Sequence, residues 1–140
     1  MLRFLRSIFR RVPGDSPQLA IERFHRHQID LHAAFYSLAA SSGTPRDLNW
    51  LSCEWLEEFQ LARESTTGLI TLLTAVNVRF TAVEGGDMED VAAVNTVRNG
   101  TAIFHYQNGR WGTGGRVLFN LTPAQVTERM PETFQQIAVE

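Results

Sequence analysis

The sequence contains no lysine and a single cysteine, Cys53. One cysteine excludes an internal disulfide and a zinc site built on several thiolates. All 13 basic side chains are arginines spread along the chain, which indicates a compositional bias rather than a separate need for guanidinium at each position. No stretch approaches the roughly 18 apolar residues of a membrane span, and the N-terminus lacks the uninterrupted apolar core of a signal peptide. We therefore expect a cytoplasmic protein.

An excess of charge of one sign is also lacking, since the formal net charge is −2 over 140 residues. Composition alone therefore does not predict nucleic-acid binding. The length suits one domain with a single core, and we expect residues 14–140 to form a single α+β domain.

Residues 1–13 differ from the rest because they are basic and carry no acid. At helical spacing the apolar side chains fall on one side and most arginines on the other. The candidates for contact with a partner or a membrane are Arg3, Phe4, Arg6, Phe9, Arg10 and Arg11. Three interpretations stay open: the segment packs on its own domain, docks on a protein partner, or binds an anionic membrane surface weakly.

One long helix is expected next, capped by Ser16 with Pro17 and ending near Ala40, before Gly43. Its apolar row has heptad-like spacing and consists of Ile21, Phe24, Leu31, Phe35 and Leu38. Gln28 occupies the same row and is its polar exception. A helix this apolar on one side must pack on the face of a sheet.

Residues 69–83 predict a long central strand, because apolar residues alternate along a β-branched stretch. The apolar row is Ile70, Leu72, Val76, Val78, Phe80 and Ala82. Only Thr74 interrupts it. Residues 50–61 also alternate and are interpreted as a strand with a bulge near Glu57 and Glu58, while a short helix is the competing interpretation.

Turn signals define the remaining elements. Asn108-Gly109 predicts a hairpin between residues 101–106 and 110–119, and Asn99-Gly100 predicts another turn. Residues 91–98 are a strand or an extended connection. Thr122 begins a short C-terminal helix with a capping box, and we expect the last residues of the chain to fray. The fold class is α+β: one long N-terminal helix on a curved antiparallel sheet of about four strands, and a short C-terminal helix.

The hairpin Tyr106-Gln107-Asn108-Gly109-Arg110-Trp111 and the element order over about residues 17–121 resemble the cystatin-like and NTF2-like group of α+β folds. This resemblance implies a curved sheet that wraps a helix. No catalytic motif matches, so the resemblance assigns no catalytic residue.

Several polar side chains are candidates for lining a pocket between helix and sheet, namely His25, Asp30, His32, Tyr36, His105 and Tyr106. His25 and His32 are seven residues apart, too far for one metal ion unless another element supplies ligands, so neither metal nor cofactor is predicted. Cys53 is interpreted as a small buried apolar side chain rather than a nucleophile.

Three functions follow from these patterns. The first is a non-enzymatic binding or assembly module that contacts a protein partner or a second copy through the outer face of the long strand. That face is expected to expose Leu69, Leu73, Ala75 and Val83. The second is a small NTF2-like enzyme or ligand-binding protein with a polar pocket. The third, nucleic-acid binding, is disfavoured because the chain beyond residue 13 is acidic. We favour the first.

Overall fold

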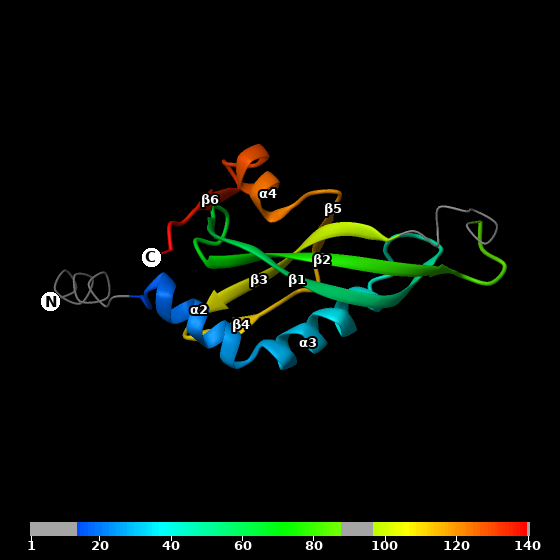
Figure 1. Ribbon diagram of the computed structural model, residues 1–140, viewed down its shortest axis with the longest axis horizontal. Coiled ribbons are helices and arrows are strands. Elements are labelled where there is room, and N and C mark those ends of the chain that lie inside the picture. The colour runs from blue at the N-terminus through cyan, green and yellow to red at the C-terminus, as the bar shows by residue number, and fades with distance from the viewer. Residues whose placement is uncertain (1–13, 88–96, 140) are drawn as a thin grey trace, which may run out of the picture.

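The computed structural model describes residues 14–87 and 97–139, which form helices packed on one antiparallel sheet (Figure 1). In chain order the elements are α2 (Pro17–Arg26), α3 (Gln28–Ala40), β1 (Leu48–Glu64), β2 (Ile70–Ala82), β3 (Arg98–Gln107), β4 (Arg110–Gly112), β5 (Val117–Phe119), α4 (Pro123–Arg129) and β6 (Phe134–Gln136). The α+β class is confirmed, but the described part of the sheet has six strands rather than about four. The basic segment 1–13 and most of the connection expected over residues 91–98 lie outside the described residues.

The prediction of one long N-terminal helix is wrong, because the helix breaks at His27, where φ is −112° and ψ is 16°. The predicted start is confirmed, since the amide of Leu19 donates to Ser16 Oγ at 3.1 Å. No proline or glycine stands at the break, so its cause is packing rather than a local signal. α2 buries Phe24 and α3 buries Phe35 against the same core, and the bend lets both helices follow the sheet beneath which they lie (Figure 1).

β2 is the central strand, and both of its faces are covered. The strand order is β4-β3-β2-β1-β6, with β5 beside β3. The predicted apolar row of β2 packs toward α2 and α3, where the buried members are Ile70, Leu72, Val76, Val78 and Phe80. On the opposite face a second core is formed by Ala62, Leu73, Ile103, Val126 and Phe134.

The expectation that Leu73 and Ala75 are exposed on the outer face is therefore wrong. Leu73 is fully buried and Ala75 is 6% exposed. α4 lies on this side of the sheet, opposite α2 and α3 (Figure 1), and supplies Val126 to the second core. β6, the strand beside β1, supplies Phe134. The outer face therefore offers no apolar surface at Leu73 or Ala75 for a second copy.

β1 is a strand, as favoured over the helix, and it carries the predicted bulge. Trp55 pairs with Val76 and Phe59 pairs with Thr74, so residues 56–58 of β1 stand opposite the single residue Ala75. A bulge of this kind bends the strand and redirects its side chains. Leu56 and the residues beside it consequently stand apart from the regular ladder.

The hairpin at Asn108-Gly109 is confirmed, with positive φ angles of 53° and 78° at its two central residues. The turn predicted at Asn99-Gly100 is wrong, because both residues lie within β3 and pair with β2. Gly100 serves packing instead: a Cβ there would lie 2.9 Å from Val117 Cγ2 on the neighbouring β5. Glycine thus permits a close strand contact here rather than a turn.

The C-terminal segment combines a confirmed helix start with an unexpected strand. The amide of Gln125 donates to Thr122 Oγ1 and the amide of Thr122 donates to Gln125 Oε1, which completes the predicted capping box. A strand that was not predicted follows α4, because β6 pairs with residues 62–64 of β1. Among the described residues, no helix has the length and apolarity needed to cross a membrane.

Candidate functional site

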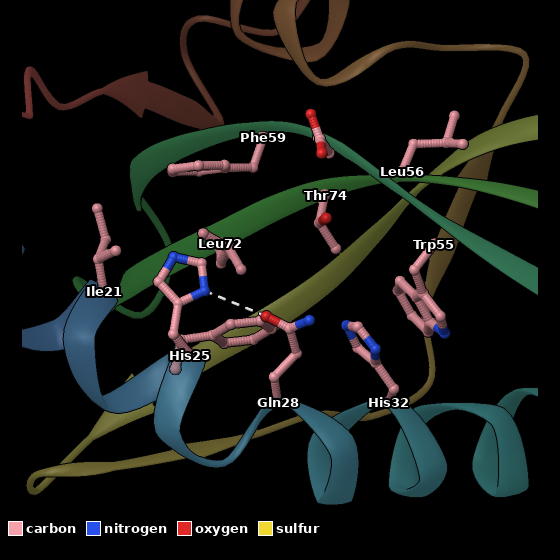
Figure 2. A pocket seen from close by; sticks show the side chains of 11 residues that line it. Ile21, His25, Gln28, His32, Trp55, Leu56, Phe59, Leu72 and Thr74 are labelled. Carbon is pink, nitrogen blue, oxygen red and sulfur yellow. Dashed lines mark hydrogen bonds between the residues drawn. The ribbon is translucent and has the colours of Figure 1, made fainter.

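A pocket of about 260 Å³ lies between the two N-terminal helices and the sheet (Figure 2). Side chains of α2 and α3 rise from one side, and side chains of β1 and β2 face them from the other (Figure 2). Its lining residues are Ile21, Phe24, His25, Gln28, His32, Trp55, Leu56, Glu57, Phe59, Leu72 and Thr74. The bulge of β1 contributes Leu56 and Glu57 to this wall.

The structure brings two of the predicted pocket residues, His25 and His32, into this one cavity. Asp30 is exposed and does not line it. Tyr36 lies further along α3, where its hydroxyl donates to the carbonyl oxygen of Trp50 at 3.1 Å. Tyr36 therefore ties α3 to β1 rather than facing a ligand.

Tyr106 is buried at the hairpin and belongs to a separate polar cluster. Its hydroxyl donates to Asp15 and accepts from Arg23 Nη1 at 2.8 Å. Arg23 also donates to the carbonyl oxygen of Gly109 at 3.2 Å and pairs with Asp15 at 3.0 Å. Burial, together with the hydrogen bond to Asp15, raises the pKa of Tyr106 above its usual range. This cluster fastens the start of α2 to the hairpin.

His105 lies on the opposite face of the sheet from the pocket, beside Glu64. Its Nε2 is 3.3 Å from Glu64 Oε1, in ion-pair range but without hydrogen-bond geometry to any described residue. Burial alone would raise the pKa of Glu64, but the hydrogen bond from Thr67 and the charge of His105 outweigh it and lower that pKa. His105 is therefore a partner of Glu64 and not a pocket residue.

An aromatic wall forms one side of the pocket. The His32 ring is stacked on Trp55, with centroids 3.9 Å apart and planes inclined by 5°. Burial lowers the pKa of His32 below its ordinary value of 6.5, so the ring is neutral at pH 7. His25 Nδ1 lies 3.1 Å from Gln28 Oε1, and this contact holds both side chains at the pocket wall (Figure 2).

Thr74 is the polar group at the sheet side of the pocket. The residue is 6% exposed, and its hydroxyl makes no hydrogen bond to any residue that the structure describes. The two fully buried threonines nearby differ, because Thr71 donates to Leu69 O and Thr101 donates to Leu121 O. Among the described residues the only fully buried side-chain polar atom without a hydrogen bond is His105 Nε2, so the Thr74 oxygen is open to the pocket. Thr74 therefore leaves a hydrogen bond for a molecule in the pocket to complete.

Sequence reasoning found the two histidines but not the residues that shape the site. Thr74 interrupts the apolar row of β2, and Gln28 interrupts the apolar row of the helical segment. The packing of α3 over β2 places these two exceptions in the same cavity. The usable signal was a polar interruption on each of two elements expected to pack together. Trp55 and Phe59 carried no such signal, because aromatic residues on strands usually pack in the hydrophobic core and so do not mark a pocket.

The arrangement offers binding groups rather than an activated nucleophile or a metal centre. Burial raises the pKa of the Cys53 thiol to about 12, so it is protonated at neutral pH. Within residues 14–87 and 97–139, no three His, Cys, Asp or Glu side chains gather closely enough to hold a metal ion. The sequence matches no protein-family model, no characterised protein and no solved structure. The resemblance to the cystatin-like and NTF2-like group stays a prediction.

Proposed function

We propose that this protein is a non-enzymatic binding module that holds one small molecule in the pocket between α2–α3 and β1–β2. The observation that carries this proposal is the hydroxyl of Thr74, which has no hydrogen-bond partner among the described residues and is open to a cavity lined by aromatic rings. Protein interiors are normally closely packed, with their polar groups paired. A cavity in this interior with an open, unpartnered hydroxyl on its wall suits a ligand site.

Binding is favoured over catalysis in the same pocket by the surroundings of its histidines. A catalytic histidine is typically oriented by a further hydrogen-bonded group, often a carboxylate. His25 contacts the neutral amide of Gln28, and His32 stacks on Trp55. Among the described residues, the only histidine in ion-pair range of a carboxylate is His105, outside the pocket. The pocket therefore lacks the oriented base that an enzyme of this kind would use.

Calorimetric titration with 2-naphthol tests the proposal, using a variant that fills the pocket. Gln28→Trp places a large ring at the half-buried start of α3, where Gln28 lines the cavity. Ala33→Trp is the matched control, since Ala33 is exposed on the same helix and does not line the cavity. We expect the wild type and Ala33→Trp to bind equally and Gln28→Trp to bind at least about tenfold more weakly, because the ring occupies the ligand volume. Equal affinity of all three, or no binding by the wild type, contradicts the proposal.

A second candidate function, assembly with a second copy of this chain, is favoured by the open edge of β1. Beyond β2, the described strands pair with β1 only at residues 62–64, so residues 51–60 form an unpaired edge. Leu51 is 58% exposed and Leu56 is 40% exposed along it. Unpaired edges with apolar side chains favour pairing with another strand.

Light scattering during size-exclusion chromatography of the full chain tests this second candidate. We expect a dimer that Leu51→Arg converts to a monomer, because the new charge would enter the paired edge. Leu38→Arg, at an exposed leucine of α3 (46% exposed), is the control and should leave the dimer intact. A wild type that is monomeric at every concentration contradicts this second candidate function.

A further inference from the structure

We infer that the ligand of this pocket is an uncharged planar compound of one or two rings that carries a hydrogen-bonding group. This rests on the proposed binding function and specifies the chemical class that the site accepts. The size of the cavity, the shape of its walls, its charge and its unpaired polar atoms favour this class of ligand.

Size limits the ligand first. The cavity of about 260 Å³ is smaller than the roughly 300–1,000 Å³ of pockets that bury drug-sized molecules. The volume suits a fused pair of rings at most. A dinucleotide, a long acyl chain or a peptide strand would have to extend far outside the described walls.

The walls are flat, which favours a flat ligand. His32 and Trp55 stack on each other with centroids 3.9 Å apart, so the pair leaves only its outer ring faces for a ligand. Across the pocket, Phe59 meets His25 at an interplanar angle of 83° and a centroid distance of 6.4 Å, so an edge meets a face there. Planar rings contact such surfaces by stacking or by edge-to-face packing.

The charge of the lining excludes ions from the inner part of the pocket. His25, His32 and Glu57 are the titratable side chains that line it, and no arginine does. His32 is neutral because burial lowers its pKa, so an anionic ligand would find no fixed cation there. Glu57 is exposed to water, where an ion pair adds little. Around Thr74 the lining is apolar, with Leu72 and Phe24, and an ion placed there would lose its hydration without compensation.

Unpaired polar atoms require that the ligand be able to hydrogen-bond. The hydroxyl of Thr74 can both donate and accept. The side-chain amide nitrogen of Gln28 and both ring nitrogens of His32 make no hydrogen bond to the described residues. Thr74 faces the side chains of Gln28 and His32 from the opposite wall (Figure 2). A polar group on the ligand can therefore bond to the sheet, the helix or both.

Four probes built on one ring system test this class: naphthalene, 2-naphthol, 2-naphthoate and 2-naphthylmethylammonium. Dissociation constants would be measured on the full chain by calorimetry, with naphthalene by competition against 2-naphthol. We expect 2-naphthol to bind about fivefold more tightly than naphthalene, the value of one hydrogen bond. Both ions should bind at least about tenfold more weakly than 2-naphthol because of their desolvation.

The variant Thr74→Val tests whether the Thr74 hydroxyl causes the preference for 2-naphthol over naphthalene. The variant keeps the branched shape and removes the hydroxyl, so its affinity for 2-naphthol should fall to that for naphthalene. Thr81→Val is the matched control, a half-buried threonine on the same strand that does not line the pocket. Thr81→Val should keep the wild-type preference for 2-naphthol over naphthalene.

The outcomes separate the ligand class from the proposed function. An ion that binds more tightly than 2-naphthol overturns the inference and leaves the binding function standing. An undiminished preference for 2-naphthol in Thr74→Val also overturns it. Failure of all four probes to bind overturns the proposed function together with the inference.

Discussion

At the scale of single residues, Thr74 and Thr101 are both buried threonines of neighbouring strands that differ in one hydrogen bond. Thr101 donates to Leu121 O at 2.7 Å, whereas Thr74 donates to none of the described residues. Thr101→Val should therefore lower the free energy of unfolding by about 1–2 kcal/mol, because it leaves that carbonyl without its donor. Thr74→Val should change it by no more than about 0.5 kcal/mol, because the Thr74 hydroxyl makes no hydrogen bond within the protein and is open to the pocket.

Urea unfolding of the ligand-free protein, followed by circular dichroism, measures both changes. The two variants carry the same chemical substitution, so the difference between them isolates the hydrogen bond. A loss of stability in Thr74→Val as large as that in Thr101→Val would mean that the hydroxyl has a partner within the protein. A ligand would then have nothing to complete.

His32 provides a pH dependence whose sign follows from burial. Its pKa in the folded protein lies below the ordinary value of 6.5 that the unfolded chain shows. The unfolded state therefore takes up a proton first as the pH falls, and the contribution of His32 to stability is complete above pH 6.5 and declines below it. The titratable groups that line the same cavity are His25, on α2, and Glu57, on β1.

Unfolding curves of the wild type and His32→Phe between pH 7.5 and 5 test this dependence. The phenyl ring keeps the stack on Trp55 and does not titrate, so the variant should lose less stability on acidification than the wild type. His27→Gln, at an exposed histidine, is the control and should follow the wild type more closely. Identical pH profiles of the wild type and His32→Phe would contradict the burial of a neutral ring.

At the scale of elements, Gly115 determines how the connection between β4 and β5 passes the end of α3. Its φ is +77°, and a Cβ there would lie 2.8 Å from Ala39 N and 2.8 Å from Leu38 Cβ. Gly115→Ala should therefore lower the free energy of unfolding by at least about 2 kcal/mol. Gly114→Ala should change it little, because a Cβ at Gly114 meets nothing within 4 Å. Equal thermal denaturation midpoints for the two variants would disprove this close approach.

Elements with complete local signals were predictable from the sequence. The hairpin at Asn108-Gly109, the capping box at Thr122 and the long alternation of β2 each depend on residues close together in the chain. The bulge of β1 was predictable because two adjacent glutamates interrupt an apolar alternation.

Elements set by distant partners were not predictable. The break at His27 has no local signal, and β6 forms only because residues 62–64 of β1 offer an edge. The burial of Leu73 depends on α4, some fifty residues further along the chain, folding onto that side of the sheet. The same limit applied to the site. Its histidines could be proposed as binding residues from their residue type, but Thr74 could be assigned to the pocket only from the packing of α3 opposite it.

At the scale of the whole molecule, two cores lie on opposite faces of one sheet, and only one of them is opened by the pocket. The second core, which includes Leu73, Val126 and Phe134, is fully buried and makes no contribution to the pocket lining. The second core therefore packs α4 against the sheet independently of what fills the other side. This arrangement lets the face toward α2 and α3 keep a cavity without loss of the fold.

The three tryptophans provide the most direct test of the central claim that this cavity is a ligand site. Trp50 Nε1 donates to Thr44 O at 2.9 Å and Trp111 Nε1 donates to Ala20 O at 2.7 Å. Trp55 lines the pocket, and its Nε1 bonds to none of the described residues. Titration of ¹⁵N-labelled protein with 2-naphthol, followed through the three indole N–H resonances, should shift that of Trp55 saturably and leave the other two in place. No shift, or a saturable shift of Trp50 or Trp111 with Trp55 unmoved, would contradict the assignment of this cavity as the binding site.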